Sequence, residues 1–315
     1  MRENGLAPIG SYIGVSTAGV ISEPLSQSIL GTKHLDISAK TNVASGFSLI
    51  NQLAEIPKEF PNKAIVADAN GKITDIKKSA AGGYHVTIGD KEHYVAPGFN
   101  VLVNKGDTVE KGDVLTEGVI NPSEIVKYKG IGEGRKHYVE AMHAAFKGAG
   151  IPVNRRNFEI IAKNAIDHVR VTNPDGLGDY LPDQVISYQG LERSYKPRDN
   201  SKLIRIDAAK GKYLEVPVMH FTIGTPITES VIKQLKDNDI ESITVNEDKP
   251  GFEPEMIRLV DVPEHVDDWM HQLYSTNLER RLTNIVNTGV HSSSDIKGPS
   301  PIPGLAYGVG FGSKG

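Results

Sequence analysis

The apolar positions of the N-terminal region recur at helical spacing. Residues 42–56 carry apolar side chains about every third or fourth position, and Pro57 and Pro61 follow them. This spacing predicts an amphipathic helix that ends before the first proline. Upstream, residues 11–33 predict helical structure interrupted at Pro24, because proline removes a helix hydrogen bond.

From residue 63 the pattern changes to short alternating apolar and polar runs. Alternation with a period of two predicts half-buried strands, and the dipeptides between the runs are typical of tight turns. These turns are expected at Asn70-Gly71, Gly82-Gly83, Gly89-Asp90 and Gly106-Asp107. The sequence therefore predicts a small β barrel or sandwich over residues 63–120.

Helical spacing returns over residues 121–171. The first predicted helix stops at Gly148 or Gly150, and the second begins at Asn154, a favourable N-cap, and leads into a strand at 169–171. The expected buried face of the first consists of Tyr138, Met142, Ala145, Phe146 and Ala149. That of the second consists of Phe158, Ile161, Ala162 and Ala165.

The C-terminal half is less regular. Residues 173–200 are expected to be rich in loops, residues 215–262 to form a compact α/β unit, and a last helix is expected near 267–286. The chain is thus predicted to be an α+β multidomain protein. Its expected segments are a helical region (1–62), a β module (63–120), a helical pair (121–171), a loop-rich region with a small α/β unit (172–262), and a C-terminal helix with a Gly/Pro/Ser tail (263–315).

Composition narrows the classes of function. The net charge is −4 and the isoelectric point is about 6.2, so no global basic charge predicts nucleic-acid or membrane binding. The absence of cysteine excludes disulfides and thiol catalysis. No apolar run approaches the about 20 residues of a membrane-spanning helix. We therefore expect a soluble protein of the cytoplasm, without a membrane partner.

Histidines and acidic residues do not predict a metal site. His137 and His143, like His265 and His271, are six residues apart, which does not match the spacing of helical metal ligands. No string of alternating aspartates occurs. We expect this chain to have no metal ligands of its own.

Two glycine-rich stretches have simple structural interpretations. The run KGDTVEKGDVL over 105–115 is of a kind shared by barrel-like carrier domains, in which a lysine is modified. A simpler explanation is a pair of tight turns, in which glycines allow the turn and aspartates accept hydrogen bonds from nearby backbone amides. The run KGIGEGRK over 129–136 lacks the complete phosphate-loop pattern, and its glycines more simply shape the entry to the following helix.

Basic residues near these glycines are candidates for nucleic-acid contact. Solvated lysines and arginines are the simpler interpretation, but local contact with phosphates remains open. The candidates are Lys127, Lys129, Arg135, Lys136, Arg155 and Arg156.

Residues 10–34 contain Glu23-Pro24, then Gln27, and then Thr32 and His34 separated by one residue. With this pattern the segment resembles the start of the trigger loop in the largest (β′) subunit of multisubunit DNA-dependent RNA polymerases. The match has no gap, and its Glu-Pro, Gln and Thr-x-His occur at fixed distances. The shared residues are Gly10, Ile13, Gly14, Val15, Ala18, Ile21, Glu23, Pro24, Gln27, Thr32 and His34.

The resemblance continues in the same order downstream. Residues 45–73 look like the second trigger helix and its exit into a sandwich-barrel module, and residues 106–171 are similar to the family's C-terminal segment. It is strong over 10–171 and weak over 172–285. It implies a trigger-loop helical segment followed by that module.

The resemblance also implies roles for individual residues. His34 would approach the triphosphate of the incoming nucleotide as an acid or positional catalyst. Leu30 would press on the base and Gln27 would contact the sugar. Lys33 replaces the usual phenylalanine and would add a cation beside His34.

Other departures concern the stability of the segment. Gly31 stands where the family has arginine or asparagine, and it weakens a helix by about 1 kcal/mol relative to alanine. Ser22 and Leu25 replace glycines around Glu23-Pro24. Closure of the segment would therefore be slower, differently tuned or lost.

The chain contains nothing that resembles the Mg²⁺-binding, bridge-helix and clamp regions of the family. We therefore expect a separately encoded C-terminal piece of a split, phage-type β′ subunit, a nucleotidyltransferase only within its assembly. The implied partners are a β′ N-terminal-type chain that holds Mg²⁺, β-like subunits, an ω-like or phage-specific subunit, template DNA and RNA. The expected location is the cytoplasm of a host cell, or a virion.

A protein of another class also fits the residues. Gly31, Lys33 and the weakly matched residues 172–285 suit a polymerase-derived structural or assembly protein of a virion, without catalysis. A carrier domain is a further alternative, which an intact mass equal to the sequence mass would exclude.

Overall fold

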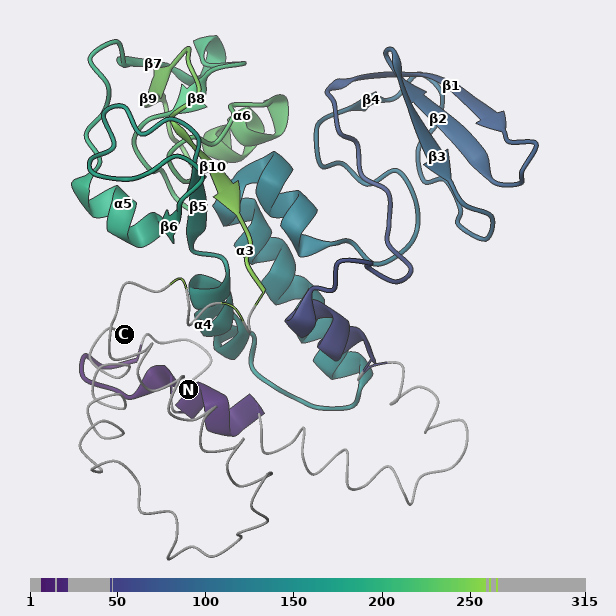
Figure 1. Cartoon of the computed structure of the whole chain (residues 1–315), viewed down its shortest axis with the longest axis horizontal. Coiled ribbons are helices and arrows are strands. Elements are labelled where there is room, and N and C mark those ends of the chain that lie inside the picture. The colour runs from purple at the N-terminus through teal and green to yellow at the C-terminus, as the bar shows by residue number, and fades with distance from the viewer. Residues whose placement is uncertain are drawn as a thin grey trace, which may run out of the picture. The chain divides into compact units, whose positions relative to one another are not determined.

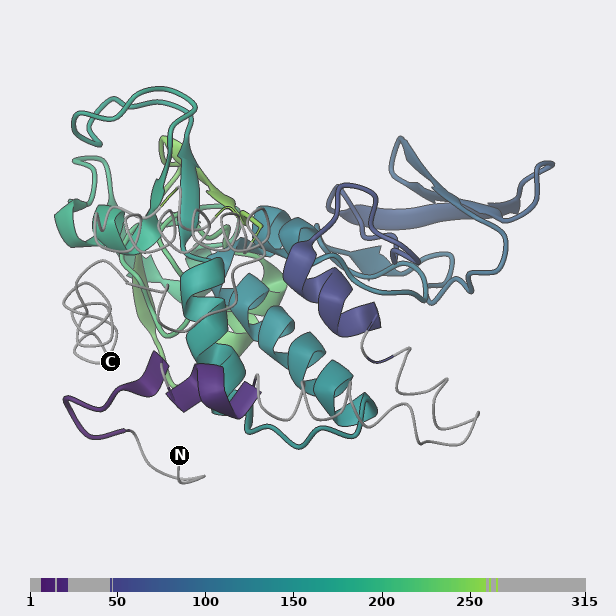
Figure 2. The same cartoon turned by 60° about the horizontal axis from the view of Figure 1, so that its bottom comes forward.

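The chain folds as an α+β protein with several antiparallel sheets (Figures 1 and 2). The computed structural model describes residues 7–14, 16–21, 46, 48–258, 261 and 265. They belong to two compact units. The first contains Met1–Ile50, Val139–Asn164 and Arg258–Gly315, and the second contains Asn51–Tyr138 and Ala165–Ile257.

A four-stranded antiparallel sheet forms the β module of the second unit (Figure 1). Its order is β3-β2-β1-β4, and Ile73 of β1 pairs with Ile88 of β2. The bounds are Gly71–Lys78 for β1, Tyr84–Ile88 for β2, Lys91–Val95 for β3 and Thr108–Val109 for β4. Short antiparallel strands are thus found within residues 63–120, whereas their closure into a barrel or sandwich stays a prediction.

The two Gly-Asp turns have the local structure that the sequence predicts. Asp107 Oδ2 accepts a hydrogen bond from the backbone N–H of Asn104 at 2.8 Å, and Asp113 Oδ2 accepts one from Glu110 at 2.8 Å. Each aspartate therefore satisfies an amide of its own turn, as side chains of this type do in short loops. Lys105, the first residue of the run over 105–115, lies 3.2 Å from Asp75.

Helix α3 (Pro122–Gly148) and helix α4 (Arg155–Ala165) correspond to the predicted helical pair. Every residue of the predicted face of α3 is at most 4% exposed. In the first unit, Phe146 of α3 packs edge-on against Phe158 of α4, with 4.9 Å between the ring centroids. Asn154 Oδ1 accepts a hydrogen bond from the backbone N–H of Arg156, as expected of an N-cap.

Two three-stranded antiparallel sheets complete the second unit, in the orders β10-β5-β6 and β7-β9-β8. In the first sheet, β5 is His168–Val171, β6 is Val185–Ser187 and β10 is Phe252–Glu255. In the second, β7 is Lys202–Arg205, β8 is Tyr213–Leu214 and β9 is Ser242–Asn246. The shorter helices are α5 (Tyr188–Ser194), the 3-10 turn η2 (Ile206–Ala208) and α6 (Glu229–Lys236).

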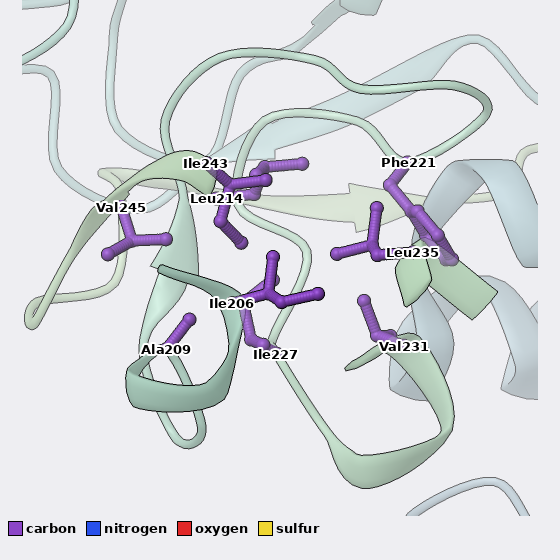
Figure 3. Close-up of a cluster of buried hydrophobic side chains, with 9 residues drawn as sticks. All are labelled: Ile206, Ala209, Leu214, Phe221, Ile227, Val231, Leu235, Ile243 and Val245. Carbon is purple, nitrogen blue, oxygen red and sulfur yellow. The ribbon is translucent and has the colours of Figure 1, made fainter. Parts of the chain in front are cut away.

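The sheet β7-β9-β8 and helix α6 share one hydrophobic core (Figure 3). Val231 and Leu235 of α6 pack with Leu214 of β8 and with Ile243 and Val245 of β9. Helix α6 and strand β9 lie within the α/β unit predicted over residues 215–262, whereas β7 and β8 precede it in the chain. Packing in this core holds α6 in place, and residues of α6 line a cleft.

The region predicted as loop-rich contains more regular structure than expected. Strand β6 and helix α5 both lie within residues 173–200. Their sequence signal is weak because β6 has three residues and pairs with the distant strand β5. The helix predicted near 267–286 and the C-terminal tail lie outside the described residues.

Candidate functional site

The most distinctive local structure of the second unit is a break in helix α3 at Gly130. This residue has a φ of 90° and a ψ of 173°, which side-chain-bearing residues rarely adopt. The break separates Lys127 and Lys129 from the longer, C-terminal part of the helix. The glycine-rich run over 129–136 therefore shapes the entry to a helix, as its sequence predicts.

Residues 220–225 cross the helix at this break. A Cβ atom on Gly130 would lie 3.3 Å from the hydroxyl of Thr225, and one on Gly132 would lie 1.8 Å from the carbonyl oxygen of His220. Thr225 also donates a hydrogen bond to the carbonyl of Thr222 at 2.7 Å. The glycines thus allow two threonine side chains to lie against the backbone of α3.

A cleft of about 360 Å³ lies beside the break, within the second unit. It is lined by residues of the β module, α3, α6, β10 and the segment that crosses α3. The charged and hydroxyl-bearing residues of its lining are Glu110, Lys111, Lys127, Tyr128, Lys129, Glu133, Tyr213, Thr222, Thr225, Thr228, Ser230, Lys249 and Glu253.

Two carboxylates of the cleft accept hydrogen bonds from backbone amides or from neighbouring side chains. Glu110 accepts from the backbone N–H groups of Glu229 and Ser230, in the first turn of α6, at 2.9 and 3.3 Å. A negative charge is favourable there because it faces the positive end of the helix dipole. Glu133 lies 2.8 Å from His220 Nε2 and accepts from Gln234 Nε2 at 3.2 Å. The hydrogen bond with His220 is the main cause that lowers the pKa of Glu133.

The third carboxylate, that of Glu253, is surrounded by lysines. Its direct contact with Lys249 is the main cause that lowers its pKa, and the charges of Lys127 and Lys111 lower it further. Within the part of the chain that the structure describes, neither Lys111 nor Lys127 forms an ion pair of its own. The cleft therefore presents ammonium groups next to hydroxyl donors.

The predicted basic residues divide between this cleft and other surroundings. Lys127 and Lys129 line the cleft, and Lys129 forms an ion pair of 2.6 Å with Asp113. Arg135 instead binds Asp167, at 2.8 Å, and the carbonyl of Ile166. Burial raises the pKa of Asp167, while Arg135 opposes that shift.

The remaining basic candidates lie beside carboxylates or on α4. Lys136 lies 4.0 Å from Glu133. In the first unit, Arg155 lies 3.9 Å from Glu140 and 3.4 Å from Glu159, and Arg156 is partly buried in the same turn of α4. Contact of these residues with nucleic acid remains a prediction.

The candidate trigger-loop residues Gln27, Leu30, Lys33 and His34 lie outside the described residues. The helical residues 16–21 just before them belong to the first unit. There the hydroxyl of Thr17 donates a hydrogen bond of 3.2 Å to Asn157 Oδ1 of α4, and both side chains are at most 4% exposed. The helical start of this segment is therefore anchored by a buried polar contact.

Sequence reasoning did not select several residues that the structure brings together. Lys111 and Lys249 come from different loops, and Thr222 and Thr225 from a third. The closely spaced glycines of α3 were the available signal, because repeated glycines on a helix indicate a close approach of other backbone. The sequence around these glycines does not show which segment of the chain approaches them.

The residues that the structure describes contain neither a candidate metal cluster nor a candidate membrane span. There, no group of three histidine, aspartate or glutamate side chains is placed to hold a metal ion. Nor is any helix of this part long and apolar enough to cross a membrane. That Mg²⁺ is held by a partner chain remains a prediction.

No family model matches the chain, but comparison with curated proteins finds relatives named DNA-directed RNA polymerase subunit beta'. The DNA-directed RNA polymerase subunit beta' of Ureaplasma urealyticum serovar 10 is 30% identical over 193 residues, or 59% of this chain. Those of Acetivibrio thermocellus and Clostridioides difficile are each 29% identical, over 65% and 73% of this chain. The chain covers only 15%, 17% and 21% of the length of these three relatives.

These similarities support a chain related to the β′ subunit of RNA polymerase over part of its length. They agree with the resemblance found from the motifs of residues 10–171. Because the relatives are several times longer, their activity as whole proteins is not transferred to this chain by similarity alone.

Proposed function

We propose that this chain is a subunit of a multisubunit DNA-directed RNA polymerase, in which it supplies the trigger segment for nucleotide addition. The observation that carries the proposal is the similarity to β′ subunits of several bacteria at about 30% identity. The ungapped motif from Gly10 to His34 supports the assignment of the trigger segment.

In this proposal the segment closes over the incoming nucleotide. Leu30 contacts the base, Gln27 the sugar, and His34 the triphosphate, where it donates a proton or holds the phosphates in position. Lys33 adds positive charge beside His34. The negative charge of the phosphates is also offset by Mg²⁺ held on a partner chain.

The described structure supports one requirement of such a segment, a fixed starting point. A loop that opens and closes needs an anchored end, and the buried hydrogen bond between Thr17 and Asn157 supplies one at the helical residues 16–21. Beyond it, Pro24 and Gly31 reduce the intrinsic helix stability of the segment. Marginal stability is what a closing element requires.

We also propose partners for the chain, which the similarity alone does not identify. Its partners would be a β′ N-terminal-type chain, β-like subunits, an ω-like or phage-specific subunit, DNA and RNA. A split, phage-type origin of the chain is part of the same proposal.

The first test replaces the proposed catalytic histidine in the assembled polymerase. We expect His34→Ala to lower the rate of nucleotide addition at saturating nucleotide by about 100-fold, the lower range for loss of acid–base catalysis. Single-nucleotide addition to a preformed RNA–DNA scaffold, followed by rapid quenching, measures this rate. A rate equal to that of the unsubstituted polymerase would contradict the role of His34.

A matched histidine variant controls for nonspecific effects. His85→Ala removes a partly exposed histidine on β2, whose Nδ1 lies 3.1 Å from Glu92. It lies outside the trigger motif, so nucleotide addition should keep the unsubstituted rate. Equal losses in both variants would indicate impaired assembly.

A further inference from the structure

Of the four lysines that line the cleft beside Gly130, Lys111 and Lys127 form no ion pair with any described residue, while Lys249 forms one with Glu253. Glu110 is engaged by the amides of α6, Glu133 by His220 and Gln234, and Lys129 by Asp113. Lys111, Lys127 and Lys249 all lower the pKa of Glu253. Lys111 and Lys127 therefore act on Glu253 without forming an ion pair with it, and their ammonium groups can donate hydrogen bonds to an anion that enters the cleft.

Hydroxyl groups complete a set of donors for anionic oxygens. Thr222 and Thr225 lie at the break of α3, and Thr228 and Ser230 lie at the start of α6. Hydroxyls and lysine ammonium groups are the side-chain donors that proteins commonly offer to phosphate oxygens. The volume of about 360 Å³ is within the range of cavities that hold small ligands.

We propose that this cleft binds a phosphate group, with Lys111 and Lys127 as its principal cationic contacts. The phosphate belongs either to a free nucleotide or to the backbone of a nucleic acid. The inference goes beyond the proposed polymerase function and does not rest on it, because binding is measured on the isolated full-length chain.

The test compares two double variants that remove the same charge. Lys111→Ala with Lys127→Ala removes the cleft lysines, while Lys78→Ala with Lys147→Ala removes two exposed lysines elsewhere. Titration calorimetry with ATP measures free-nucleotide binding. Fluorescence anisotropy with a labelled 12-nucleotide single-stranded DNA measures binding of a nucleic-acid backbone.

We expect the cleft variant to bind its probe at least 10-fold more weakly, and the control variant to stay within about twofold of the unsubstituted chain. Lys111→Arg with Lys127→Arg should restore most of the affinity, because the charges are kept. For the DNA probe, removal of two contacts should reduce the slope of log affinity against log salt by about 1.4. A misfolded variant would not show rescue by arginine.

The outcomes also identify the source of the phosphate. Binding of ATP alone assigns the cleft to a free nucleotide, and binding of DNA alone assigns it to a nucleic-acid backbone. If neither probe binds at low salt, or if both double variants lose affinity equally, the inference is overturned. None of these results depends on whether the chain assembles into a polymerase.

Discussion

Glu133 shows how a single carboxylate joins distant segments of the second unit. It lies on α3, and its partners His220 and Gln234 come from the segment that crosses α3 and from α6. The side chain is 18% exposed, so its hydrogen bonds are only partly screened by water. A hydrogen bond with a charged group contributes about 1.5–3 kcal/mol in such surroundings.

The lowered pKa of Glu133 predicts a specific dependence of stability on pH. The folded state lowers this pKa below its ordinary value of 4.5. The ionised carboxylate therefore contributes to the free energy of unfolding above pH 4.5, and this contribution is lost as the pH falls through the folded pKa. We expect Glu133→Gln to lower the free energy of unfolding by about 1–2 kcal/mol at pH 6. The difference from the unsubstituted chain should shrink as the pH falls from 4.5 through the folded pKa.

Urea denaturation at several pH values between 6 and 3 measures this difference. Glu59→Gln, at an exposed position, is the matched control and should change stability little at any pH. A deficit of Glu133→Gln that stays constant with pH would show that the charge of this carboxylate does not matter.

At the scale of elements, the close crossing of α3 by residues 220–225 predicts an unusual effect of alanine. Alanine usually stabilises a helix relative to glycine by about 1 kcal/mol. At Gly132, however, a Cβ would lie 1.8 Å from the carbonyl oxygen of His220, so backbone must move. We expect Gly132→Ala to lower the free energy of unfolding by about 2 kcal/mol or more.

Gly148 provides the internal control on the same helix. Nothing lies within 4 Å of a Cβ built there, so Gly148→Ala should leave stability unchanged or raise it by up to about 1 kcal/mol. Chemical denaturation of both variants gives the comparison. Equal effects of the two substitutions would contradict the close crossing.

The same elements show how far the sequence predicts the structure. The faces of α3 and α4 were predictable because periodic apolar residues such as Phe146 and Phe158 report burial directly. The strands of the β module were predictable because glycine turns separate alternating runs. Strand β6 and helix α5 were missed, since both are short and β6 depends on pairing with β5.

The candidate cleft was predictable only in part. Lys127 and Lys129 were selected from their position beside a glycine-rich run, but Lys111 and Lys249 approach them through folding of distant loops. Arg135 was selected for the same reason and instead binds the buried Asp167. Local sequence indicates charge, whereas the partner of each charge is set by tertiary structure.

At the scale of the whole molecule, we propose that the chain works as part of a larger assembly. Its relatives are β′ subunits about five to seven times longer than the matching part, since the chain covers 15% to 21% of three of them. Catalysis of nucleotide addition would then require groups on companion chains. A structural protein derived from a polymerase would share the similarity but not these companions.

The most direct test of this central claim is mass spectrometry of the native complex that contains the full chain. If the proposed function is correct, we expect a companion chain with the aspartate string that binds Mg²⁺, together with β-like subunits, in stoichiometric amounts. Recovery of the chain with only shell or tail components of a virion, and with no polymerase subunit, would contradict it.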